Sequence, residues 1–177
     1  MKTKPLWVIA VTFLFGLGGM FFVTTSRAGY ESAAYEVVEK SGKFEVREYR
    51  SHQVVATSMA SGENGGFGKL FRYISGDNES EQKIAMTTPV FMPANSKGET
   101  TEMQFVIPSK VSQGGAPDPS NEAVRVKSKP GGKFAVLRYS GRSDAALQKK
   151  KLAELREILK SRGTRAMGKP VFAGYDP

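Results

Sequence analysis

The side chains best suited to chemistry are few in this sequence, and they exclude most catalytic classes. The chain has no cysteine and a single histidine, His52. Thiolate chemistry, disulfides and any metal site that needs two imidazoles are therefore excluded. No nucleophile-elbow, Walker, H-E-x-x-H or G-x-G-x-x-G pattern occurs. Glu45 and Glu48 would lie on opposite faces of a strand. We predict that the protein is not an enzyme, although an isolated tyrosine or lysine acid stays compatible with the sequence.

One short stretch combines aromatic and basic residues. Four apolar side chains recur at the i, i+3, i+4, i+7 spacing of one helix face: Phe67, Leu70, Phe71 and Ile74. Lys69 and Arg72 flank this stripe. Apolar walls with cations at the rim suit an apolar ligand that carries carboxylates. Ordinary core packing is the alternative for the stripe, and by spacing alone it is the commoner outcome.

Two patterns occur twice and predict two related halves. The pattern A-M-x-x-P-V-F occupies residues 85–91 and 166–172, and G-K-F-x-V-x-x-Y occupies residues 42–49 and 132–139. A helical pattern lies between the two motifs of each half. We therefore expect two related strand–helix–strand units.

The elements that must position these residues follow from local pattern. Alternating or β-branched segments predict strands at residues 35–38, 44–49, 53–60, 83–93, 103–108, 123–127, 133–139 and 166–175. Helices are expected at 67–74 and 143–162, the second capped by Ser143. Pro89 marks an edge or bulge, residues 50–52 a connection, and residues 109–121 an irregular joint. The fold class is α+β, with two helices packed on a largely antiparallel sheet or open barrel.

The amino terminus has the features of an export signal. Lys2 and Lys4 precede an uncharged apolar run at residues 6–23, and Ser26-Arg27-Ala28 resembles a cleavage site. We expect a signal peptide at 1–28 and a domain at 29–177. The run is also long enough to span a bilayer, so an uncleaved membrane anchor is the alternative. In both cases the domain lies outside the cytoplasm, in the periplasm or the extracellular space.

The net charge is +9, of which residues 1–28 supply +3. A basic domain favours acidic partners such as carboxylate ligands or anionic lipid. A solvated basic surface without a partner is an equally weighted alternative. The sequence has no zinc knuckle, aromatic RNA-binding motif or basic arm, so no nucleic-acid partner is expected. We expect a monomer that a tether at residues 6–23 can hold at the membrane.

Several motifs together resemble the SOUL heme-binding protein family. They are Y-I-S-G-D-N at residues 73–78, K-I-A-M-T-T-P-V at 83–90, I-P-S at 107–109 and G-Y-D-P at 174–177. The resemblance runs from about residue 35 to the end. It implies a distorted antiparallel β-barrel made of two pseudo-repeated β-α-β-β units with two packed helices. It also implies non-covalent binding of heme or a related tetrapyrrole between the first helix and the sheet.

A porphyrin is a flat apolar disc with two propionates, so the resemblance selects candidate contacts. They are Phe67, Lys69, Leu70, Phe71, Arg72 and Met86. Met92 and Met103 are further soft side chains, but methionine more often fills gaps in a core. His52 is a weak candidate for an axial iron ligand, and an exposed turn histidine is the favoured interpretation.

The hypothesis from the sequence is therefore an exported heme carrier, buffer or scavenger. The alternatives are an effector-binding module for another small amphipathic ligand, as in gyrase-inhibitor-like domains that share the architecture, and an enzyme that modifies a small molecule.

Overall fold

The computed structural model describes residues 29–59, 63–141 and 144–175. The strands are β1 (Glu31–Ser32), β2 (Tyr35–Ser41), β3 (Phe44–Tyr49), β4 (His52–Ser58), β5 (Thr87–Thr88), β6 (Val90–Pro93), β7 (Glu102–Val106), β8 (Val124–Lys129), β9 (Gly132–Leu137) and β10 (Val171–Gly174). The helices are α1 (Glu63–Ile74), α2 (Ser109–Gly114) and α3 (Ala145–Ser161). The expected signal or anchor at 1–28 lies outside the described residues. None of the described helices is long and apolar enough to cross a bilayer.

The strands form two main antiparallel sheets, which confirms the α+β class. Five strands pair in the order β10-β6-β7-β4-β8, and three pair in the order β2-β3-β9. A short parallel pair, β1-β5, completes the pairing of the described strands. Neither main sheet closes on itself, so the barrel is not confirmed and the two-unit repeat stays a prediction. The described residues form three helices, one more than expected.

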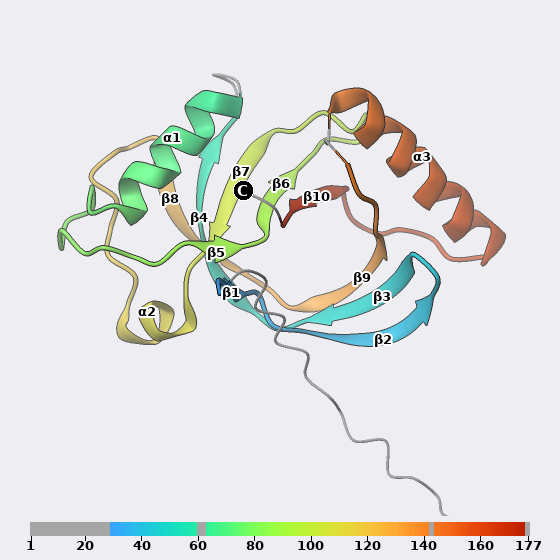
Figure 1. Ribbon diagram of the computed structural model, residues 1–177, viewed down its shortest axis with the longest axis horizontal. Coiled ribbons are helices and arrows are strands. Elements are labelled where there is room, and N and C mark those ends of the chain that lie inside the picture. The colour runs from blue at the N-terminus through green and yellow to red at the C-terminus, as the bar shows by residue number, and fades with distance from the viewer. Residues whose placement is uncertain (1–28, 60–62, 142–143, 176–177) are drawn as a thin grey trace, which may run out of the picture.

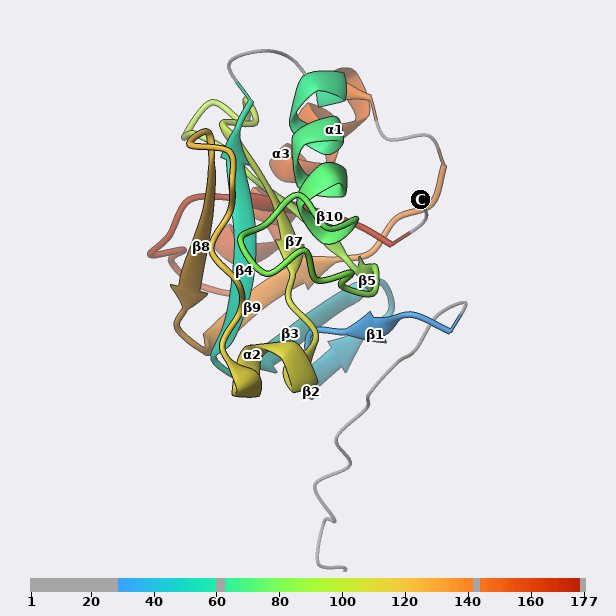
Figure 2. The same ribbon diagram turned by 90° about the vertical axis from the view of Figure 1, so that its left-hand side faces the viewer.

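Helix α1 packs directly on the five-stranded sheet (Figures 1 and 2). Its buried face places Leu70, Tyr73 and Ile74 in the core, together with side chains of β4 and β7. A Cβ built on Gly66 would lie 2.9 Å from the Met59 sulfur. The glycine therefore lets the helix approach the strands closely.

Helix α3 lies at the opposite end of the molecule from α1 (Figure 1). Asp144 caps it, because its Oδ1 accepts a hydrogen bond of 2.8 Å from the Leu147 amide. The predicted cap, Ser143, lies outside the described residues. Only Gln148, Leu152 and Leu159 are buried on this helix among its described residues.

Two segments differ from the sequence prediction in extent. The strand expected at residues 83–93 begins at Thr87 and is interrupted at Pro89, which separates β5 from β6. The last strand is limited to Val171–Gly174, after an exposed segment at 163–169. A six-residue helix, α2, stands in the segment expected to be irregular.

Candidate functional site

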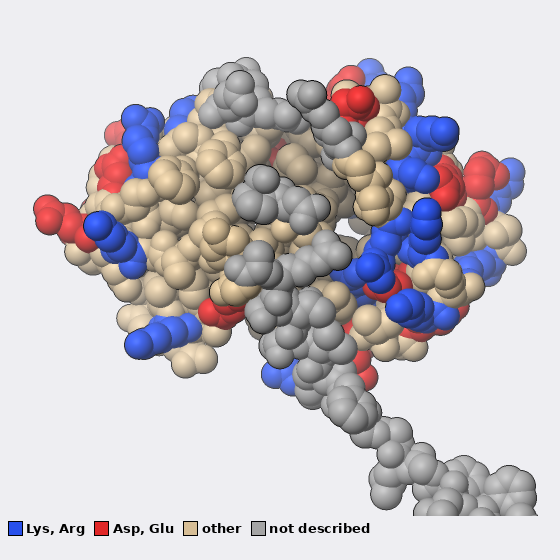
Figure 3. All heavy atoms as spheres, viewed as in Figure 1, with Lys and Arg blue, Asp and Glu red and all other residues tan. Residues whose placement is uncertain are grey.

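A large cavity lies between β3, β9 and α3. Its volume is about 1160 Å³, which is slightly above the usual range for small-molecule sites, about 300–1,000 Å³. Figure 3 shows an opening on this side of the molecule, with lysine and arginine side chains gathered near it. The apolar side chains that line the cavity include Phe44, Val46, Phe134, Val136, Leu152, Leu155, Leu159 and Phe172.

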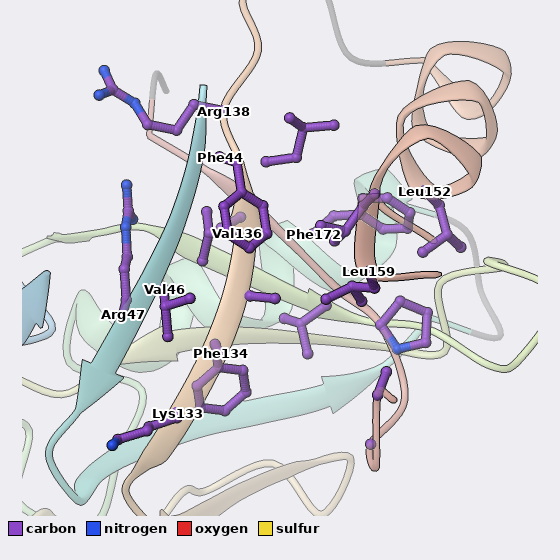
Figure 4. A pocket seen from close by; sticks show the side chains of 18 of the residues that line it. Phe44, Val46, Arg47, Lys133, Phe134, Val136, Arg138, Leu152, Leu159 and Phe172 are labelled. Atoms are coloured by element: carbon purple, nitrogen blue, oxygen red, sulfur yellow. The ribbon is translucent and has the colours of Figure 1, made fainter. Parts of the chain in front are cut away.

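Strand pairing explains how the sequence builds two of these walls. Strands β3 and β9 are antiparallel, with Phe44 opposite Leu137 and Arg47 opposite Phe134. Successive side chains of a strand point to opposite faces. Figure 4 shows the result: Phe44 and Val46 lie on the side of β3 toward α3, whereas Arg47 extends from the other side. The lining therefore draws side chains from both faces of the β3–β9 pair: Phe44 and Val46 from the face toward α3, and Arg47 with its cross-strand neighbour Phe134 from the other.

The lining carries a strong excess of positive charge. Among the described residues, Glu39 is the single acid in the lining, and ten lysines and arginines line it: Lys43, Arg47, Lys129, Lys133, Arg138, Lys151, Arg156, Arg162, Arg165 and Lys169. Within the described parts of the chain, Lys129, Arg165 and Lys169 form no salt bridge. These three cations are therefore available to an anionic ligand, and the site favours molecules that carry carboxylates.

Arg47 and Glu45 form a buried ion pair beside the cavity. The Arg47 Nε and Nη2 atoms lie 2.8 and 2.7 Å from Glu45 Oε2, and Arg138 Nη1 donates to Glu45 Oε1 at 3.1 Å. Burial by itself raises the pKa of the Glu45 carboxyl, but hydrogen bonds from Arg47 and Arg138 outweigh it and hold that pKa below its ordinary value. Glu45 is therefore charged at neutral pH.

Two phenols complete the surroundings of Arg47. Its Nη1 donates to the Tyr175 hydroxyl at 3.0 Å and to the Tyr49 hydroxyl at 3.3 Å. Burial alone lowers the pKa of the Arg47 guanidinium, but the contacts with the phenols and with Glu45 outweigh it, so the pKa is raised. Arg47 is a fixed charge whose donors are mostly occupied, and it serves the architecture of the cavity wall.

His52 lies elsewhere than the sequence suggested. It is the first residue of β4 rather than part of an exposed turn, it is half-buried, and it lines the cavity. Its Nδ1 is 2.9 Å from the Arg50 carbonyl oxygen, and its Nε2 is buried with no hydrogen-bond partner among the described residues. The ring centroid is 6.0 Å from that of Phe91. Sequence reasoning missed this placement because the pairing of β4 with β8 extends to His52 opposite Lys129.

The six contacts predicted from the sequence lie at the α1 end, and none of them lines the large cavity. Phe67 and Phe71 are 39% and 51% exposed, and their rings stack with centroids 6.0 Å apart. Leu70 is fully buried in the core. Lys69 is half-buried and Arg72 is exposed.

Met86 is also half-buried, and with Phe67 it lines a second, much smaller space of about 20 Å³. The structure therefore brings Phe67 together with Phe71 and with Met86. Whether these six residues contact a ligand stays a prediction.

The fold and the cavity define a small α+β protein built to hold an amphipathic ligand. The sequence model described as "SOUL heme-binding protein" matches residues 30–177. Heme-binding protein 2 of Mus musculus is 30% identical over 155 residues, which cover 81% of this chain and 75% of that protein. Heme-binding protein 2 of Homo sapiens is 31% identical over 147 residues, covering 76% and 71%. The chain belongs to the SOUL heme-binding protein family.

Proposed function

We propose that the protein binds heme or a related tetrapyrrole non-covalently in the cavity between β3, β9 and α3. The observation that carries the proposal is the combination of apolar walls and excess cations in one cavity of about 1160 Å³, in a chain of this family. A porphyrin offers a flat apolar disc and two propionates, and these two surfaces match the two parts of the lining.

The residues that would hold the ligand are of two kinds. Phe134 and Leu155 provide apolar surface in the lining, where they would exclude water from the macrocycle. Lys129, Arg165 and Lys169 would meet the propionates. The tetrapyrrole brings its own iron chemistry when bound, and the chain binds, orients and shields it.

A reversible carrier, buffer or scavenger is the role that such a site supports. No covalent attachment residue is needed, and the chain has no cysteine to provide one. We place this role outside the cytoplasm, with a monomer that is either released after cleavage at Ala28 or tethered through residues 6–23. The mass of the mature amino terminus tests this placement: loss of residues 1–28 supports release, and an intact chain supports the tether.

A hemin titration with two matched variants tests the site. Leu155→Asp places a charge in the cavity wall on α3, and Phe71→Asp places one on the exposed face of α1. We expect wild type and Phe71→Asp to show the same saturable Soret shift, and Leu155→Asp to bind at least about tenfold more weakly, because a buried charge is costly. Far-UV circular dichroism confirms that both variants fold.

If Phe71→Asp weakens hemin binding and Leu155→Asp does not, the ligand binds at α1, as the sequence predicted. Lys169→Gln gives a second, milder variant, since Lys169 is exposed and forms no described salt bridge. It should weaken binding without changing stability. If hemin shows no saturable shift, the proposal fails. If bile pigments and unrelated aromatic acids compete as well as protoporphyrin does, the effector-binding alternative leads instead.

A further inference from the structure

The positive charge of the domain is concentrated in one segment, residues 145–175. This segment carries eight lysines and arginines and two acids, which gives it a net charge of +6. The rest of the expected domain, residues 29–144 and 176–177, has no net charge. Helix α3 and the exposed stretch 163–169 that follows it lie at the end of the molecule opposite α1 (Figure 1). A one-sided distribution of charge like this one orients a protein toward an anionic surface.

An exposed apolar side chain lies within this basic segment. Met167 is 94% exposed, more than any other large apolar side chain in the described parts of the chain. Arg165 and Lys169 lie two residues to either side, are exposed, and form no salt bridge with a described residue. The stretch 163–169 contains no acid. An apolar side chain between two cations suits the surface of a bilayer, where the apolar group enters the acyl boundary and the cations meet lipid phosphates.

We infer that this segment docks the protein on an anionic lipid bilayer, with Met167 among the lipids and with Arg165 and Lys169 against the headgroups. Lys160, in the last turn of α3, is a third exposed cation without a described salt bridge. Nucleic-acid phosphates would leave Met167 in water, and an acidic protein would need a matching apolar pocket, whereas a bilayer accepts any apolar group.

Docking in this orientation would bring the large cavity close to the membrane, because Arg165, Met167 and Lys169 also line that cavity. Figure 3 shows lysine and arginine side chains near the opening on this side of the molecule. The inference goes beyond the proposed function, since it does not need the cavity to hold a porphyrin.

Labelling at a single cysteine tests the docking, because the chain has no cysteine of its own. Met167→Cys is labelled with NBD, a fluorophore whose emission rises in an apolar environment. Phe71→Cys is the matched control, since Phe71 is 51% exposed on α1, at the other end of the molecule. The full chain is used, so that an anchor at residues 6–23 would hold both proteins on vesicles equally. We expect mixed phosphatidylglycerol and phosphatidylcholine vesicles to raise the emission at residue 167 alone, and pure phosphatidylcholine vesicles to raise neither.

A matched pair of double variants tests the electrostatic part in the labelled Met167→Cys protein. Arg165→Gln with Lys169→Gln removes two charges beside the label. Lys83→Gln with Lys110→Gln removes two from exposed positions outside the basic segment. The ratio of docked to undocked protein, read from the fluorescence, should fall about tenfold in the first variant, since each cation near an anionic surface contributes up to about fivefold. It should change far less in the second, and added salt should lower it in the unsubstituted protein. Far-UV circular dichroism confirms that the variants fold.

Four results would overturn the inference. They are an equal response of the two labels, a larger response at residue 71, an equal response to pure phosphatidylcholine vesicles, and a docking ratio that Arg165→Gln with Lys169→Gln leaves unchanged. A response at residue 167 to duplex DNA or polyglutamate as large as that to anionic vesicles would overturn it too, because the site would then bind polyanions in general. None of these samples contains hemin, so their outcome is independent of the Soret titration that tests the proposed function.

Discussion

Replacement of Glu45 by glutamine should destabilise the protein far more than the same replacement at Glu48. The Glu45 carboxylate is 3% exposed and accepts from Arg47 at 2.8 and 2.7 Å and from Arg138 at 3.1 Å. Its loss leaves the Arg47 guanidinium, which is 5% exposed, without a neutralising charge. Breaking one side of a buried ion pair costs about 3–5 kcal/mol. Because glutamine keeps one acceptor oxygen, we expect the lower end, about 3 kcal/mol.

Glu48 is the matched control, because it lies on the same strand but faces solvent. Its carboxylate is 51% exposed and 3.9 Å from the Lys133 ammonium. Exposed pairs of this kind contribute about 0–1 kcal/mol. Urea unfolding at pH 7, followed by far-UV circular dichroism, measures both free energies of unfolding. If Glu45→Gln lowers the free energy of unfolding by no more than Glu48→Gln does, the buried pair does not stabilise the fold as argued.

The same pair makes a pH prediction with a defined sign. The pKa of Glu45 is lower in the folded protein than its ordinary value of 4.5. The stability that ionised Glu45 provides is therefore complete above about pH 5 and is lost as pH falls through the folded pKa. Glu45→Gln lacks this contribution, so the difference between wild type and variant should shrink as pH falls below 4.5. A difference that is constant from pH 7 to pH 3 would contradict the assignment.

Two further substitutions test the packing around this framework. Burial and Asp118 raise the pKa of Tyr73 to about 12, and its hydroxyl donates to a backbone carbonyl at 2.8 Å. Tyr73→Phe should therefore lower the free energy of unfolding by about 1–3 kcal/mol at pH 8. The folded wild type keeps the Tyr73 proton, so its free energy of unfolding falls as pH rises from about 10 to 12. The difference in free energy of unfolding between wild type and Tyr73→Phe should therefore narrow over this range in urea titrations. A difference that stays constant would contradict the raised pKa. A Cβ on Gly131 would lie 2.6 Å from the Tyr49 carbonyl oxygen, whereas one on Gly132 meets only an aromatic ring at 3.9 Å. Gly131→Ala should therefore lower stability by about 1–3 kcal/mol, and Gly132→Ala by less. Thermal unfolding of the two variants measures the difference. Equal losses would show that the turn accommodates a side chain at residue 131.

The elements with a periodic signal were predictable from the sequence. The i, i+3, i+4 stripe predicted a helix at residues 67–74, and α1 covers Glu63–Ile74. The first turn, before Phe67, was missed because Gly65 and Gly66 add no apolar residue to the helical pattern. Helix α2 was missed for a related reason: it has six residues, no side-chain cap and no buried side chain. Its one apolar core contact, the half-buried Val111, is too little to give a periodic hydrophobic pattern.

The large cavity could not be predicted from the same patterns. Alternation shows which side chains of β3 share a face, and periodicity shows which face of α3 is apolar. Neither gives the distance between the helix and the strands, because residues far apart in the sequence set it, such as Phe44 and Arg162, whose guanidinium lies 4.2 Å from the centre of the Phe44 ring. His52 was likewise assigned to a connection at residues 50–52, because its position in β4 depends on its long-range pairing with Lys129.

The two ends of the molecule differ in how closely a helix approaches the strands. At the α1 end, Gly66 permits close contact and Leu70 is fully buried, so the space left beside Phe67 and Met86 is about 20 Å³. At the α3 end, long lysine and arginine side chains occupy the face beside Leu155, and the space is about 1160 Å³. Among the described residues, the larger of these two spaces is thus the one at the α3 end. The cations without a described salt bridge and the apolar side chains of β9 and α3 line that same space, which is why the proposed function places the ligand at this end.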